Sequence, residues 1–64
     1  MMNFEQLIKI IDKGIISMKE LRQITNDELV ESVSMGKPDD KHKGHFKYDV
    51  KLTNGELHYV YVKM

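Results

Sequence analysis

The Asn54-Gly55 dipeptide, which lies between two runs of alternating apolar residues, is the feature that most restricts the fold of this chain. Asn-Gly in this setting is the strongest local signal for a two-residue β-hairpin turn, because both turn positions need a positive φ. Such a turn sets a register in which Leu52 faces Leu57, Val50 faces Tyr59 and Tyr48 faces Tyr61. The sequence therefore predicts that one face of the hairpin gathers Phe46, Tyr48, Tyr59 and Tyr61.

The part of the chain before the hairpin is predicted to be helical. Asn3 precedes a helical pattern of apolar residues, and Gly14 is expected to end this first helix. Ser17 to Glu20 and Thr25 to Glu28 both fit a capping box, in which a helix-start side chain and the third helical residue bond each other's backbone. These signals predict a second helix over 18–24 and a third over 26–35, with a merged second and third helix as the main alternative.

Two further segments complete the expected arrangement. The β-branched pair Ile15-Ile16 could form a short strand. Val60 and Val62 make the last hairpin strand apolar on both sides, which is typical of a central strand, so Ile15-Ile16 could pair with it as a third strand. Residues 37–44 carry only turn and charged residues and are predicted to be an exposed loop.

The predicted fold is one α+β domain over 1–64, with three short helices packed on a C-terminal antiparallel hairpin that could become three-stranded. A chain of 64 residues is one domain with a marginal core. It contains no cysteine, which excludes disulfides, cysteine zinc sites and thiol catalysis.

The expected order is helix, short strand, helix, helix, strand, strand. With Ile15 to Leu21 as the strand and cap that open the turn motif, and Asn54-Gly55 as the tip of a wing, this order resembles a winged helix-turn-helix domain. The resemblance implies a DNA-binding transcriptional regulator with residues 26–35 as its recognition helix. The exposed residues of that helix are acidic or small, however, and carboxylates facing phosphate oppose DNA binding.

Charge divides the chain into two halves. The formal net charge is zero, which argues against general attraction to nucleic acid. Residues 1–36 hold four basic and six acidic residues, and 37–64 hold six basic and four acidic residues. Two candidate contact surfaces follow. A protein partner would meet the acidic face of the third helix, at Asp27, Glu28, Glu31, Ser32 and Ser34. The alternative, nucleic-acid contact, would use Lys37, Lys41, Lys43, Lys47 and Lys51.

No motif points to catalysis, a cofactor or a metal. Asp39, Asp40, His42 and His45 are suitable metal-ligand types, but their spacing matches no closed site and Lys41 and Lys43 lie between them. No serine has a histidine and carboxylate pattern around it. The sequence predicts a non-enzymatic chain without a cofactor or a metal.

The predicted function is a small binding module, an inhibitor or adaptor that docks on a protein partner. Small chains of this kind are frequent among phage and mobile-element inhibitors, which is an analogy only. No apolar run is long enough for a membrane span and no secretory signal is visible, so a cytoplasmic location is expected. The chain is expected to be a monomer or a homodimer.

Overall fold

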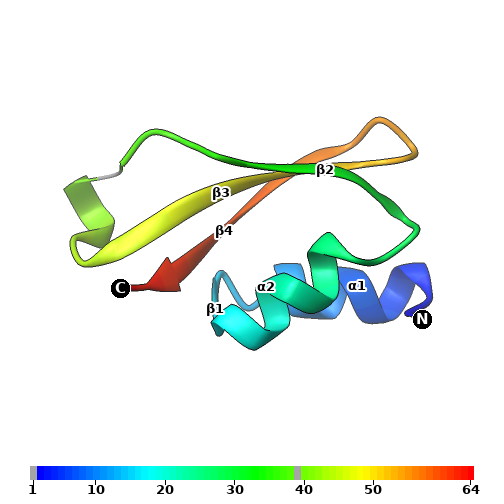
Figure 1. The fold of residues 1–64 in the computed structure, drawn as a ribbon, viewed down its shortest axis with the longest axis horizontal. Coiled ribbons are helices and arrows are strands. Elements are labelled where there is room, and N and C mark those ends of the chain that lie inside the picture. The colour runs from blue at the N-terminus through cyan, green and yellow to red at the C-terminus, as the bar shows by residue number, and fades with distance from the viewer. Residues whose placement is uncertain (1, 39) are drawn as a thin grey trace.

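The computed structural model describes residues 2–38 and 40–64 of the chain, and in them two α-helices pack on one face of a four-stranded mixed sheet (Figure 1). The elements in chain order are α1 (Phe4–Ile11), β1 (Ile15–Ile16), α2 (Met18–Thr25), β2 (Val30–Met35), the 3-10 helix η1 (Asp40–His42), β3 (His45–Leu52) and β4 (Leu57–Lys63). The strand order is β1-β4-β3-β2, with β1 parallel to β4 and the other pairs antiparallel. The predicted three helices on a hairpin are therefore wrong, although the α+β class loosely agrees.

Two of the three predicted helix N-caps form, those at Asn3 and Ser17, and the predicted cap at Thr25 does not, because Thr25 is the last residue of α2. The Asn3 side chain accepts a hydrogen bond from the Gln6 amide, and the Gln6 side chain accepts one from the Asn3 amide. α1 ends at Ile11, three residues before Gly14, which has a φ of 78° and turns the chain into β1. The predicted second helix over 18–24 is confirmed with one more residue, Thr25.

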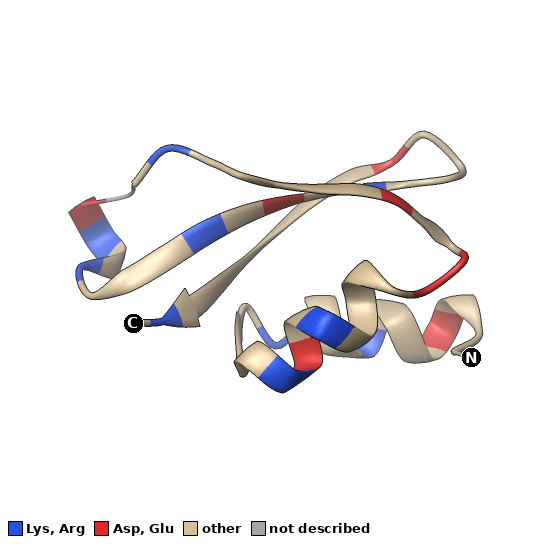
Figure 2. Ribbon diagram, viewed as in Figure 1, with Lys and Arg blue, Asp and Glu red and all other residues tan. Residues whose placement is uncertain are grey.

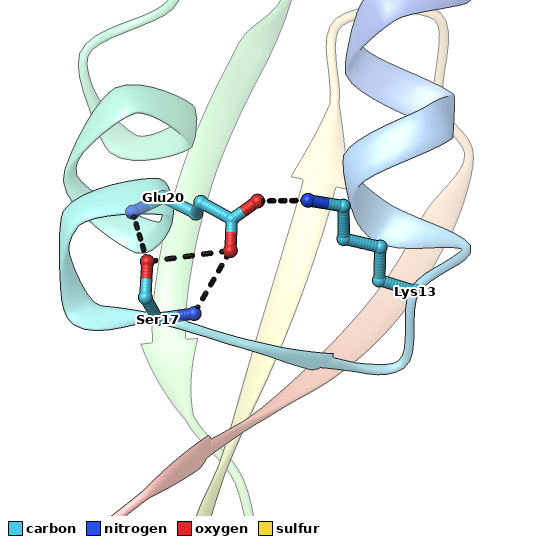
Figure 3. Close-up of polar contacts among 3 residues, drawn as sticks. All are labelled: Lys13, Ser17 and Glu20. Carbon is cyan, nitrogen blue, oxygen red and sulfur yellow. Dashed lines mark hydrogen bonds and ion pairs between the residues drawn. The ribbon is translucent and has the colours of Figure 1, made fainter.

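The cap of α2 also ties α2 to the end of α1 (Figure 3). The Glu20 carboxylate accepts a hydrogen bond from the Ser17 amide at 3.1 Å, and its other oxygen pairs with the Lys13 ammonium. The Lys13 contact first, and then the Ser17 amide, hold the pKa of Glu20 below its usual value of 4.5.

The core lies between the helices and the central strands. Leu7, Ile11, Leu21 and Ile24 of the helices meet Val50 and Leu52 of β3 and Val60 and Val62 of β4, and Ile16 of β1 closes the cluster. The predicted pairing of Ile15-Ile16 with the last strand is confirmed: Ile15 lies beside Tyr61, and Ile16 beside Val62. β4 is therefore a central strand, which accounts for its apolar residues on both faces.

The loop between β3 and β4 has three residues, one more than the expected two-residue turn. The Gly55 amide donates to the Leu52 carbonyl and the Leu52 amide donates to the Glu56 carbonyl, so the loop is Thr53-Asn54-Gly55. Gly55 has a φ of 92°, and among the described residues only glycines have a positive φ. A two-residue turn would need a positive φ at Asn54 too. Here Asn54 instead accepts the Glu56 amide with its side chain.

This one-residue difference moves half of the aromatic residues to the other face. Tyr48 lies opposite Val60 and Val50 lies opposite His58, whereas Tyr59 lies opposite Asp49 and Tyr61 opposite Lys47. Because side chains alternate along a strand, a shift of one residue in the pairing turns every β4 side chain over. Phe46 and Tyr48 are on the helix side, and Tyr59 and Tyr61 are on the outer side. The predicted gathering of all four rings is wrong.

The predicted third helix over 26–35, alone or merged with the second, is also wrong, because residues 30–35 form β2. The Asp27 carboxylate accepts backbone hydrogen bonds from Leu29 and Met2, so it organises a turn where a helix start was expected. A β-bulge between Val30 and Ser32 adds one residue to the strand. Because of the bulge, Val30 and Val33 are three residues apart, which is a spacing typical of a helix. The regular alternation of a strand begins only after the bulge.

Candidate functional site

The outer face of the sheet, on the side away from α1 and α2, is an exposed apolar surface that the strand register creates. It presents Ile15 from β1 and Leu57 and Tyr59 from β4, with exposed fractions of 50%, 70% and 56%. Monomeric proteins rarely leave such side chains grouped on one surface unless they meet a partner. We call Ile15, Leu57, Tyr59 and Tyr61, with Lys47 and Lys51 beside them, the outer-face patch.

Tyr61 is covered although it points to the outer side. Its exposed fraction is 6%, because the His42 ring of η1 stacks on it with ring centroids 3.7 Å apart and planes 11° from parallel. Tyr59 meets Tyr61 edge-on at 5.8 Å. The segment after β2 thus folds back over one end of the outer face.

Two lysines of β3 border these rings. The Lys47 ammonium lies 4.6 Å from the centre of the Tyr59 ring, a cation–π contact. The Lys51 ammonium lies 3.2 Å from the Glu31 carboxylate of β2, and both side chains are about half exposed. The patch therefore has an apolar centre with a polar border of mixed charge, because Asp49 lies between Lys47 and Lys51 on the outer side of β3 and Glu31 pairs with Lys51.

The predicted acidic contact residues do not share a helix face. Asp27 is 7% exposed, and both of its carboxylate oxygens accept backbone hydrogen bonds at 3.0 Å. Glu28 follows it in the exposed turn. Glu31, Ser32 and Ser34 are exposed on β2, where Ser32 and Ser34 are register partners of Lys51 and Asp49. The structure brings the last three residues together, but on a sheet edge.

The predicted basic residues follow one path from the end of β2 through η1 and along β3. Lys37 comes after β2, Lys41 belongs to η1, Lys43 comes after it, and Lys47 and Lys51 lie on β3. Figure 2 shows blue basic segments at η1 and along β3, with red acidic segments among them. Lys47 and Lys51 belong to the outer-face patch. The path is therefore interrupted by acidic residues and is not a continuous basic stripe.

Surface hollows in the described part of the chain include the following two. One of about 480 Å³ is lined by Met2, Gln23, Asn26, Asp27 and Glu28. The other, of about 150 Å³, lies at the Met35 end of β2 and is lined by Gly36, Pro38, Phe46 and Met64 among others.

The structure describes only some of the candidate metal-ligand residues of the 39–45 segment. Asp39 lies outside the described residues. Among residues 2–38 and 40–64, no group of three or more His, Asp or Glu side chains is arranged to hold a metal ion. His42 instead contacts the rings of Tyr61 and His45.

Sequence reasoning did not identify the outer-face patch, because it placed Val60 and Val62 on the outer side and the tyrosines inside. One signal could have found it. Val60 and Val62 are aliphatic residues suited to the same core as Val50. A three-residue loop that ends at Gly55 places both valines on the helix side of the sheet. Gly at the third loop position is common in such hairpins.

Comparison of the chain with protein-family models, with curated proteins and with solved structures finds no match. Within the described residues, both α-helices have eight residues, and neither reaches the length and apolar character that a membrane crossing requires.

Proposed function

We propose that this protein is a small non-enzymatic binding module, an inhibitor or adaptor, that docks on another protein through the outer-face patch. The observation that carries the proposal is the exposure of Ile15, Leu57 and Tyr59 on the sheet face that the helices leave open. Protein interfaces combine an apolar and aromatic centre with a polar border, and tyrosine is enriched among the residues that dominate binding.

The charge of the border indicates the kind of partner. Lys41 and Lys43 lie in and after η1, beside the Lys47 end of β3. At the other end of β3, Lys51 is paired with Glu31. Complementary potentials favour correct docking. The partner is therefore a protein surface with an apolar centre, with carboxylates at the side that meets Lys43 and Lys47.

The rings themselves favour a protein over a single-stranded nucleic acid. Base stacking needs a free ring face. His42 already covers Tyr61, and the Lys47 ammonium lies over Tyr59. The expected recognition helix of a winged-helix regulator is also missing, because residues 30–35 form a strand. Nucleic acid remains as an outcome of the experiment below.

The test is affinity capture from a lysate of the source organism, with and without nuclease. We expect a specific protein to be retained after nuclease treatment by the wild-type chain and to be lost with the Leu57→Ser, Tyr59→Ala variant. Both side chains are largely exposed, so this variant keeps its fold, which circular dichroism verifies.

Met18→Ser is the matched control, because Met18 is also an exposed apolar side chain and lies on α2, outside the patch. This variant should retain the partner. Loss of every partner after nuclease would indicate nucleic-acid binding, and equal capture by the two variants would show that the outer-face patch is not the contact surface.

A further inference from the structure

β2 is an edge strand whose outer edge is open. Within the described part of the chain, β2 pairs only with β3, and its residues from Glu31 to Met35 are exposed except for the half-buried Val33. Proteins usually protect such an edge with bulges, lysines or prolines. The bulge of β2 lies before Ser32, and the run Ser32-Val33-Ser34-Met35 contains none of these devices.

The backbone groups that face this open edge follow from one hydrogen bond. The Gly36 amide donates to the Lys47 carbonyl at 2.8 Å. In an antiparallel pair, residues alternate between those that bond the neighbouring strand and those that face away. Ser32 and Ser34 therefore bond β3 as Gly36 does, and the N–H and C=O groups of Val33 and Met35 point outward.

We propose that this edge binds a second copy of the same chain, with the two β2 strands antiparallel and centred on Ser34. In this register the outward groups of Val33 exchange hydrogen bonds with those of Met35 in the second copy, and the reverse pair forms by symmetry. A two-fold interface requires such self-complementarity. All four outward groups of each strand are then paired.

The side chains agree with this register. Val33 and Met35 lie on the helix side, as register partners of Val50 and Tyr48. Each Met35, 62% exposed in the single chain, would come beside Val33 of the second copy. On the outer side, Ser32 would lie opposite Gly36 of the second copy, and this pair brings no like charges together. A register centred on Val33 would instead place Met35 opposite Glu31, where the bulge disturbs the ladder.

This pairing makes one continuous sheet with the order β1-β4-β3-β2-β2-β3-β4-β1. Because the two-fold axis runs perpendicular to the sheet, the helices of both copies lie on the same side. The two outer-face patches therefore lie side by side on the opposite side. The proposal depends on β2 alone and stands whether or not the outer-face patch binds a protein.

The experiment uses single-cysteine variants, which are clean probes because the chain has no cysteine. In the proposed register Ser34 lies directly opposite Ser34 of the second copy, with Cα atoms about 4.5 Å apart in a pair without mutual hydrogen bonds. This distance is within the range of a disulfide. We expect Ser34→Cys to form a covalent dimer rapidly under mild oxidation.

Ser32→Cys is the matched control, because Ser32 is an exposed serine on the same strand. Its opposite residue is Gly36, and the two Ser32 positions lie about 14 Å apart along the paired strands. It should not cross-link. Sedimentation of the wild-type chain over a concentration series should show a transition from 7.5 kDa to twice this mass, and Ser34→Lys should abolish it because like charges would face each other.

The proposal requires both selective cross-linking at Ser34 and the sedimentation transition. Equal cross-linking of the two cysteine variants, absence of cross-linking at Ser34, or a wild-type monomer at every concentration would each overturn it. Binding of β2 to a foreign peptide without self-association would overturn it as well.

Discussion

Asp27 shows how a residue that looks like a surface contact can serve the fold. It is the one buried charged residue among those described, and its carboxylate joins the chain start, at the Met2 amide, to the turn before β2, at the Leu29 amide. Such a group satisfies two backbone donors that have no other partner in a helix or strand. The Asp27 carboxylate therefore stabilises the fold and does not serve as a surface contact.

Replacing Asp27 with alanine should therefore destabilise the protein by about 2 kcal/mol, because buried donors lose their acceptors. Glu28→Ala, in the next and exposed position, is the control and should change the free energy of unfolding by less than about 0.5 kcal/mol. Urea denaturation measures both values. Similar losses for the two variants would contradict the structural role of Asp27.

Glu20 predicts a specific dependence of stability on pH. Its pKa is lowered in the folded chain by Lys13 and the Ser17 amide, so at pH values just below 4.5 the unfolded state binds more protons at this site. The stabilisation from Glu20 is full above 4.5 and is lost as the pH falls through the folded-state pKa. Glu20→Gln should remove this contribution, so its unfolding free energy should decline less than that of the wild type on acidification. An identical decline would contradict the contact.

At the scale of the element, the β3–β4 loop depends on Gly55 more than on Asn54. A Cβ at Gly55 meets no atom within 4 Å, so Gly55→Ala is penalised only by its positive φ, at about 1 kcal/mol. Asn54→Ala loses only one exposed hydrogen bond and should cost less. Thermal unfolding compares the two variants. Equal losses would indicate a two-residue turn in which both positions need a positive φ.

The elements that the sequence predicted are those with local causes. The Asn3 and Ser17 caps, the helical spacing of Leu7 and Ile11, and the two hairpin strands depend on residues close together in the chain. β2 was missed because its bulge hides the alternation and because the turn before it needs Asp27 to meet the distant Met2 amide. β2 also belongs to the sheet only because it pairs with β3, and no local sequence pattern predicts this pairing.

For the candidate site, too, the sequence predicted what depends on nearby residues and not what depends on the strand register. Lys47, Lys51 and the tyrosines were singled out from the sequence, but their common surface depends on a register that one loop residue decides. Glu31, expected as a free acidic contact, pairs with Lys51 from the set expected to bind nucleic acid. The types of residue were visible in the sequence, and their grouping was not.

At the scale of the whole molecule, the sheet separates two surfaces. α1 and α2 cover one face (Figure 1) and bury the aliphatic residues of β3 and β4. The other face keeps Ile15, Leu57 and Tyr59 exposed. The open edge of β2 lies between the two faces. The proposed partner surface and the proposed self-association edge are distinct parts of one sheet, so the two can be tested separately.

The most direct test of this arrangement is the set of nuclear Overhauser effects between α-protons across β3 and β4. Such contacts connect opposite residues that do not exchange hydrogen bonds. The structure predicts them for Lys47 with Tyr61 and for Asp49 with Tyr59. Contacts of Tyr48 with Tyr61 and of Val50 with Tyr59 would instead place the rings together on one face and contradict the outer-face patch.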